Sequence, residues 1–229
     1  MSGTVSEPAK ERFLRILRIL EGSLSEGELS ERNYTSVELE ALTGWPSHTI
    51  RKDISSLLKS EQLENDKSGH FFAGSTLGYA PRSLVPLIKE ALGLDRRRKF
   101  CVVGLGRLGS AYLNLDSAIL GEFELAAGFD TNVNRVEILK SPVPLYPSHK
   151  MAEVISRFCV EIALLCVPAE AAQGVAEKLA GAGIKGILNF APLILNLPAV
   201  PGKSVAVRNV YVADELRALT VTMASENRK

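Results

Sequence analysis

From residue 100 onward, short apolar runs alternate with segments of helical spacing, and this alternation constrains the fold more than any other feature of the chain. The strand-like runs are mostly apolar, so the sheet that they form is expected to be buried on both faces. Such strands, alternating with helices, build a doubly wound, mainly parallel α/β sheet. The predicted strands are 100–103, 123–129, 162–167, 187–189 and 205–210, and the predicted helices are 108–114, 151–157, 169–182 and 213–224.

A glycine-rich loop, Gly104-Leu-Gly106-Arg-Leu-Gly109, follows the first predicted strand directly. In a dinucleotide site the first glycine allows a tight turn, the second allows the pyrophosphate to approach the backbone, and the third allows the helix to pack closely on the strand. The N–H groups that open the following helix would face the phosphates. Because strand, loop and helix occur in the required order, the motif predicts a Rossmann-like domain over residues 96–212 that binds NAD(H). The alternative is a tight turn that binds nothing.

Asp130 closes the strand predicted at 123–129 and lies 24 residues after Gly106. A carboxylate at about this spacing accepts hydrogen bonds from the hydroxyls of the adenosine ribose and disfavours a 2′-phosphate. Asp130 therefore predicts a preference for NAD(H) over NADP(H). A turn or cap aspartate is the alternative interpretation.

The sequence does not show the catalytic residues that a dehydrogenase would need. A dehydrogenase needs a proton donor or acceptor beside the nicotinamide, usually His, Lys or Tyr. His48 and His70 precede the nucleotide-binding part, and His149 lies in a loop rich in proline. The chain after residue 95 has the size of a single nucleotide-binding domain, which leaves no substrate domain. We expect a protein that is not an enzyme, with a small NAD-dependent oxidoreductase as the alternative.

Residues 1–95 have the helical spacing of a different domain. Helices are predicted over 13–20, over 37–42 with Ser36 as the N-cap, from Ser47 as the N-cap of a third helix, and over 84–94. Gly44 separates the second helix from the third. The segment 61–79, dotted with glycine and containing an aromatic pair, suits a β-hairpin or wing.

The short helix, tight turn and following helix have the layout of a helix-turn-helix, whose second helix enters the major groove of DNA. Arg51 and Lys52 can contact guanine or phosphate there. An ordinary helical hairpin with a solvated Arg-Lys pair is the alternative. The predicted DNA-facing residues are Ser47, His48, Arg51, Lys52 and Ser55.

Charge and composition further limit the class of protein to which this chain can belong. The net charge of +1 provides no global attraction to nucleic acid, and residues 1–95 hold 11 Lys and Arg against 14 Asp and Glu, so attraction to phosphate is expected to be local and weak. The three cysteines have neither disulfide nor zinc-site spacing, and their apolar surroundings predict buried, reduced thiols and no metal. No apolar run is long enough to span a bilayer. With a polar N-terminus, these features predict a cytoplasmic protein without membrane contact.

The order of the parts, together with the segment Thr49-Ile-Arg-Lys-Asp-Ile-Ser55, resembles the Rex family of bacterial redox-sensing transcriptional repressors. The likeness continues through Gly104-Leu-Gly-Arg-Leu-Gly-Ser110 and Glu161-Ile-Ala-Leu-Leu-Cys-Val-Pro-Ala-Glu-Ala-Ala-Gln173. It is closest at Ala182-Gly-Ile-Lys-Gly-Ile-Leu-Asn-Phe-Ala-Pro192, and it extends from about Arg12 to Met223.

The resemblance implies a homodimer whose winged-helix domains, residues 1–95, bind a palindromic operator and whose operator affinity follows the NADH/NAD⁺ ratio. NADH would favour a closed form that cannot span the two half-sites. Residues 213–229 would form a terminal helix that crosses to the partner subunit, although packing on its own sheet is an alternative. The cofactor contacts implied are Gly104, Gly106, Arg107, Leu108, Gly109, Asp130, Val167, Pro168, Asn189, Phe190, Ala191 and Pro192.

Arg18 matches a first-helix arginine that, in similar family members, is coupled to an aspartate and a tyrosine as part of the NADH switch. This chain carries Tyr211 and Leu115 at those two positions, and Val212 where a neighbouring aromatic shields the nicotinamide. Asp214 or Glu215 would then have to pair with Arg18. A Rex-like homologue that binds DNA with a weak NADH response, or none, is therefore an alternative to the NADH-responsive repressor.

Overall fold

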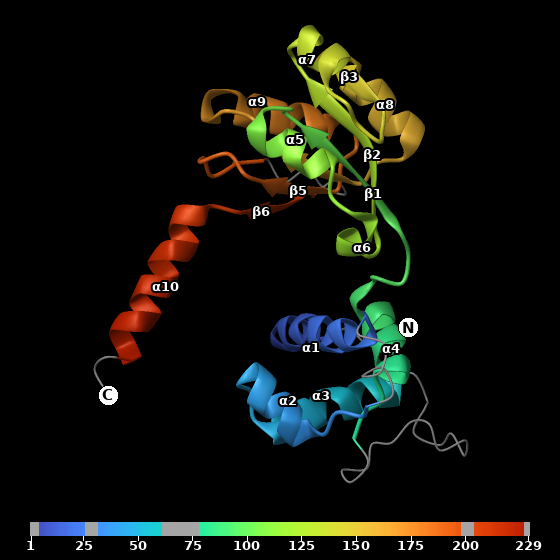
Figure 1. The fold of residues 1–229 in the computed structure, drawn as a ribbon, viewed down its shortest axis with the longest axis vertical. Coiled ribbons are helices and arrows are strands. Elements are labelled where there is room, and N and C mark those ends of the chain that lie inside the picture. The colour runs from blue at the N-terminus through green and yellow to red at the C-terminus, as the bar shows by residue number, and fades with distance from the viewer. Residues whose placement is uncertain (1–4, 26–31, 61–77, 198–203, 227–229) are drawn as a thin grey trace. The chain divides into compact units, whose positions relative to one another are not determined.

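A computed structural model describes residues 5–25, 32–60, 78–197 and 204–226 (Figure 1). The chain divides into two compact units, residues 1–96 and residues 97–229. Each unit has a hydrophobic core of its own, so each is described by itself. Within the described stretches, no helix has both the length and the apolar character that crossing a membrane would require.

The first unit is built from helices α1 (Glu7–Ser25), α2 (Ser36–Thr43), α3 (Ser47–Ser60) and α4 (Pro81–Leu92). Apolar residues recur along one face of α1 and α3, and these faces meet α2 and α4 in a common core. The most deeply buried members of this core are Phe13, Ile16, Leu20, Leu39, Ile50, Ile54 and Ile88. The short helix α2, the turn and α3 thus form the predicted helix-turn-helix layout.

The N-caps of α2 and α3 differ from the predicted ones. Thr35, rather than Ser36, is the N-cap of α2: its side chain accepts a hydrogen bond from the N–H of Glu38, whose carboxylate accepts one from the N–H of Thr35. This reciprocal capping box satisfies two N–H groups at once, so it fixes where the helix begins. Ser47 is already the first residue of α3 and not its cap. Gly44 ends α2 in the left-handed region, with φ of 80°, as its position predicted.

The predicted wing lies almost entirely at residues 61–77, outside the described residues. Of its last two residues, Tyr79 forms an isolated antiparallel bridge with Tyr34.

The second unit contains a six-stranded parallel sheet in the order β3-β2-β1-β4-β5-β6. This is the strand order of the doubly wound dinucleotide-binding fold. The strands are β1 (Arg98–Val103), β2 (Phe123–Asp130), β3 (Leu145–Pro147), β4 (Ile162–Leu165), β5 (Gly186–Asn189) and β6 (Ala206–Asn209). The helices are α5 (Arg107–Leu113), α6 (Ser117–Leu120), α7 (Val133–Ile138), α8 (Met151–Phe158), α9 (Ala169–Gly181) and α10 (Val212–Glu226), with a 3-10 turn at Ser148–Lys150.

Helices cover both faces of this sheet, as the mostly apolar strands predicted. Cys101 and Val103 of β1 pack on the face covered by α8 and α9, and Phe100 and Val102 pack on the face with α5 and α6. The predicted parallel α/β sheet is confirmed. The elements β3, α6 and α7 were not predicted.

Candidate functional site

The main candidate site is a cavity of about 870 Å³ at the carboxyl ends of the strands. The strand order reverses between β1 and β4, and doubly wound sheets bind their ligands beyond the strand ends at this point. Gly104 and Gly106 line the cavity after β1, Asp130 lines it at the end of β2, and Val167 and Pro168 line it after β4.

The three glycines of the loop meet different surroundings. Gly104 has a φ of +90°, and a Cβ atom there would lie 2.6 Å from the carbonyl oxygen of Cys166. At Gly109, on α5, a Cβ atom would lie 1.9 Å from the carbonyl oxygen of Gly104. A Cβ atom at Gly106 would have nothing within 4 Å. The turn and the packing of α5 therefore require the first and third glycines, whereas the second borders open space in the cavity.

Asp130 lies at the predicted place, but the protein itself uses its carboxylate. The residue is 5% exposed. Its Oδ2 accepts hydrogen bonds from the N–H of Leu105 (2.7 Å) and from Nη1 of Arg135 (3.1 Å), and its Oδ1 accepts one from the N–H of Asn132 (2.8 Å). Burial alone would raise the pKa of Asp130, but these hydrogen bonds outweigh burial and bring the pKa below its ordinary value. Asp130 is thus an ionised brace between β2 and the glycine loop.

Two other sets of residues that were predicted to contact the cofactor do not line the cavity. Arg107 and Leu108 are exposed at the start of α5, next to Gly106, but do not line the cavity. The segment Asn189–Pro192 does not line it either.

Asn189 has no exposed surface. Its Nδ2 donates to the carbonyl oxygen of Leu193 (2.7 Å) and to Oδ1 of Asn209 (2.9 Å), and its Oδ1 accepts from the N–H of Ala191 (3.0 Å). This side chain shapes the turn after β5 and links it to β6. The ring of Phe190 contacts that of Tyr112, with centroids 5.0 Å apart.

Arg135 and Lys178, two cationic side chains that the sequence did not mark as site residues, also line the cavity, together with His149. Arg135 lies only five residues after Asp130, so its closeness to Asp130 could have been expected from the sequence. His149 follows β3, whose Pro147 pairs with Asp130 in the sheet. The position of His149 beside β2 could not be predicted, because β3 is only three residues long and lies in a proline-rich segment.

The cysteines only partly follow the prediction of buried thiols. Burial raises the pKa of Cys101 and of Cys166 to about 12. Cys159, which ends α8 with φ of 55°, is exposed, and Cys166 is only half-buried, both contrary to the prediction. Nowhere in the part of the chain that the structure describes do three or more metal-ligating side chains converge.

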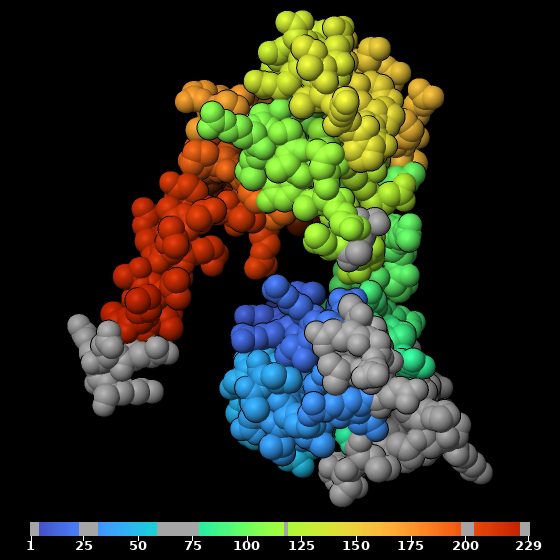
Figure 2. All heavy atoms as spheres, in the orientation of Figure 1, coloured from blue at the N-terminus to red at the C-terminus, as the bar shows by residue number. Residues whose placement is uncertain are grey.

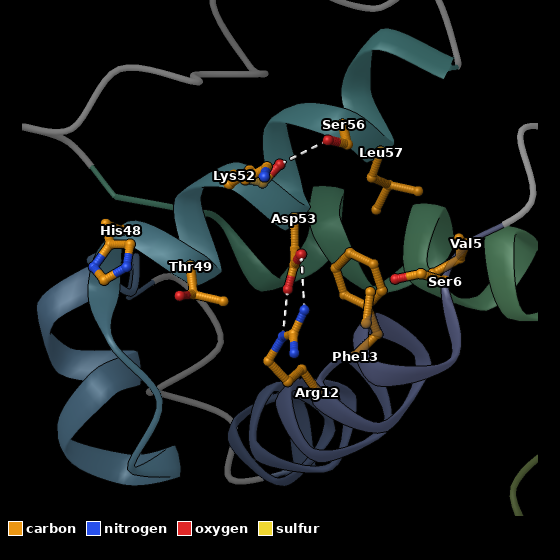
Figure 3. A pocket seen from close by; sticks show the side chains of 11 residues that line it. Val5, Ser6, Arg12, Phe13, His48, Thr49, Lys52, Asp53, Ser56 and Leu57 are labelled. Carbon is orange, nitrogen blue, oxygen red and sulfur yellow. Dashed lines mark hydrogen bonds and ion pairs between the residues drawn. The ribbon is translucent and has the colours of Figure 1, made fainter.

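A second candidate site lies on the helix-turn-helix unit. His48, Arg51 and Lys52 are exposed on α3, and Ser47 and Ser55 are half-buried. A cavity of about 610 Å³ separates the first turns of α1 from α3 and is lined by Lys52 among others (Figure 3).

A bidentate ion pair connects the two helices beside this cavity. Nε of Arg12 on α1 donates to Oδ2 of Asp53 on α3 (2.5 Å), and Nη2 donates to Oδ1 (3.1 Å) (Figure 3). The side chains are 17% and 12% exposed. Arg12 therefore helps to orient the helix that presents Arg51 and Lys52.

The residues predicted for the switch are accessible. Arg18 is exposed, and its side chain has no hydrogen-bond or ion-pair partner among the described residues. Asp214, one of its two suggested partners, pairs with Arg217 one turn further along α10. Tyr211 and Val212 are 41% and 68% exposed.

The two units together define a class of protein: a helix-turn-helix module joined to a parallel-sheet domain with a dinucleotide-type cavity. A family model described as the CoA binding domain matches residues 95–193. The redox-sensing transcriptional repressor Rex of Limosilactobacillus reuteri is 33% identical over 212 residues, which cover 93% of this chain and 87% of that protein. Rex of Thermus thermophilus is 37% identical over 220 residues, covering 94% and 91%. The chain belongs to the Rex family of redox-sensing transcriptional repressors.

Solved structures agree over nearly the full length. RSP, a Rex-family repressor, in complex with β-NAD⁺ and operator DNA, superposes with a TM-score of 0.76 at 29% identity, covering 98% of this chain and 95% of RSP. RSP in complex with β-NADH gives the same TM-score and identity, covering 98% and 97%. These relatives are named as repressors and not as enzymes.

Proposed function

We propose that this protein is a transcriptional repressor in the cytoplasm that binds NAD(H) in the cavity of its second unit and operator DNA through its first unit. The observation that carries the proposal is the open space at Gly106, since the neighbouring glycines are required by the fold whereas this one faces the cavity. The bound dinucleotide would undergo no chemistry; its occupancy would act as the signal.

Gly106 would let the diphosphate approach the backbone, and Arg107 and Leu108 would lie beside it. Val167 and Pro168 would flank the cofactor on the β4 side. The turn at residues 189–192, held by the internal hydrogen bonds of Asn189, would border the nicotinamide end.

DNA binding would use α3. His48, Arg51 and Lys52 present donors at the beginning of this helix, where helix-turn-helix proteins contact base edges and phosphates. Because the charge of this unit is not basic overall, few phosphates would be neutralised, and the salt dependence of binding would be shallow.

The active form would be a homodimer that reads a palindromic operator. Helix α10 exposes apolar side chains, with Leu216, Leu219 and Met223 each more than half exposed (Figure 2, red). The sheet face near α5 and α6 has an apolar cavity of about 620 Å³ lined by Leu115 and Leu188 among others. Apolar surface of this extent suits a protein interface, and we infer that α10 packs on the partner subunit.

Two parallel measurements test the proposal. Calorimetric titrations with NADH and NAD⁺ measure cofactor affinity, and a gel shift with operator DNA measures release. We expect both dinucleotides to bind. Full release of DNA by micromolar NADH, but not by NAD⁺, would show that the switch works despite Tyr211 and Leu115. Binding of NADH without release supports the homologue with a weak response, and absence of dinucleotide binding refutes the cofactor proposal.

The dimer is tested separately by sedimentation of a chain that ends before Ala213. We expect this chain to be monomeric while the full chain is dimeric. An unchanged dimer would show that α10 does not cross to the partner.

A further inference from the structure

The ribose end of the cavity has an unusual charge balance for an NAD-selective site. Selectivity against a 2′-phosphate normally comes from a carboxylate at the end of β2, whereas an arginine there accommodates the phosphate. Asp130 is the only acidic residue among the described residues that line the cavity, and two cations, Arg135 and Lys178, line it as well.

The carboxylate of Asp130 is largely committed to contacts within the protein. Both of its oxygens accept hydrogen bonds from Leu105, Asn132 and Arg135, and only 5% of the residue is exposed. Its negative charge is also balanced by the guanidinium of Arg135, 3.1 Å away. A phosphate near this edge would meet a paired charge and not a free carboxylate.

Arg135 retains binding capacity. Its side chain is 46% exposed and lines the cavity. Only Nη1 is used by Asp130, while Nε and Nη2 donate to none of the described residues. Arginine has five N–H donors in a planar fork that suits phosphate, so a second, outward-facing contact is open to it.

The neighbouring residues fit the same ligand. Thr131 follows Asp130 directly, and Ser148 and His149 follow β3, whose Pro147 pairs with Asp130. All three residues line the cavity. Hydroxyl and imidazole groups can donate hydrogen bonds to phosphate oxygens. These polar side chains thus form a rim beside Arg135, at the edge of the cavity where the adenosine ribose would lie.

We propose that Arg135, with the polar rim beside it, forms a subsite for the 2′-phosphate of NADP(H), so that this protein accepts the phosphorylated dinucleotide as well as NAD(H). This proposal rests on the proposed function, because it assumes that a dinucleotide occupies the cavity.

The test is a set of calorimetric titrations of the full-length protein with NADH and with NADPH. For the wild type we expect the two dissociation constants to agree within about tenfold. In Arg135→Gln, loss of a charge-assisted hydrogen bond should weaken NADPH about 10- to 100-fold and change NADH affinity less than about threefold. Lys140→Gln is the matched control, since it removes an exposed cation of the same segment outside the cavity lining.

A second variant keeps the pair between Asp130 and Arg135. Thr131→Asp adds an unpaired carboxylate to the rim and should weaken NADPH selectively, by about 10-fold or more. Circular dichroism melts establish that each variant is folded.

Three outcomes overturn the inference. If wild-type protein binds NADH but binds NADPH more than about tenfold more weakly, the subsite does not exist while the proposed function stands. If Arg135→Gln weakens both dinucleotides equally, Arg135 acts only through Asp130. If neither dinucleotide binds, the proposed function fails together with the inference.

Discussion

Replacing Gly106 with alanine separates binding from folding. Gly106 has φ of −67° and ψ of −161°, an extended conformation that alanine can adopt, and the added methyl group would have nothing within 4 Å. Alanine also restricts the unfolded chain more than glycine does. The free energy of unfolding is therefore expected to stay the same or to rise by up to about 1 kcal/mol.

The same methyl group would occupy the space through which a diphosphate approaches the backbone. Loss of one hydrogen bond to a charged phosphate corresponds to about 1.5–3 kcal/mol, so NADH affinity should fall about 10- to 100-fold. Calorimetric titration with NADH measures the affinity, and urea denaturation of the same samples measures the free energy of unfolding.

Gly109→Ala is the matched control, because its Cβ atom would lie 1.9 Å from the carbonyl oxygen of Gly104. Backbone at this distance must move, and overpacking of this kind costs about 1–3 kcal/mol or more. Unchanged NADH affinity in Gly106→Ala, or a loss of stability as large as that of Gly109→Ala, would contradict the role assigned to Gly106.

Three further predictions concern other parts of the chain. Asp53→Asn leaves Arg12 without its ionic partner and should lower the free energy of unfolding by about 1–3 kcal/mol in urea, between the values for exposed and buried pairs; an unchanged value would show that the pair does not brace α3. Hydrogen bonds lower the pKa of Glu38 to about 2, so its stabilising effect is present above its ordinary pKa and is lost as the pH falls from about 4.5 to 2. The free energy of unfolding of Glu38→Gln should therefore fall less steeply over this pH range than that of the wild type, and equal slopes would contradict this. At pH 8, iodoacetamide should modify the exposed Cys159 well before Cys166, whose thiol stays protonated. Mass spectrometry after partial labelling measures the order, and faster alkylation of Cys166 than of Cys159 would contradict the prediction.

The parallel sheet could be predicted because its signal is repeated. Mostly apolar strands alternate with helices along this unit, and the glycines after β1 have a fixed order of roles. Gly104 and Gly109 perform the predicted turn and packing roles, as the contacts at their missing Cβ atoms show. The strand β3 could not be predicted, because three residues in a proline-rich segment carry no periodicity.

The start of α2 shows a different limit. Thr35 and Ser36 are adjacent, and either hydroxyl can cap a helix. Glu38 decides between them, since it stands at the third helical position relative to Thr35 and closes the capping box. The information was present in the sequence, but only as a pair of residues three apart and not as a single cap residue.

In both units, an acidic side chain near a functional motif joins segments that are far apart in the chain. Asp53 reaches Arg12, 41 residues away, and Asp130 reaches the N–H of Leu105, 25 residues away. A carboxylate at such a position can serve either a ligand or the fold. A buried carboxylate is stable only where its oxygens accept hydrogen bonds, so burial decides between the two roles. Burial depends on which distant segments pack together, and this is why the residue type and spacing of Asp130 predicted its place at the cavity but not its partners.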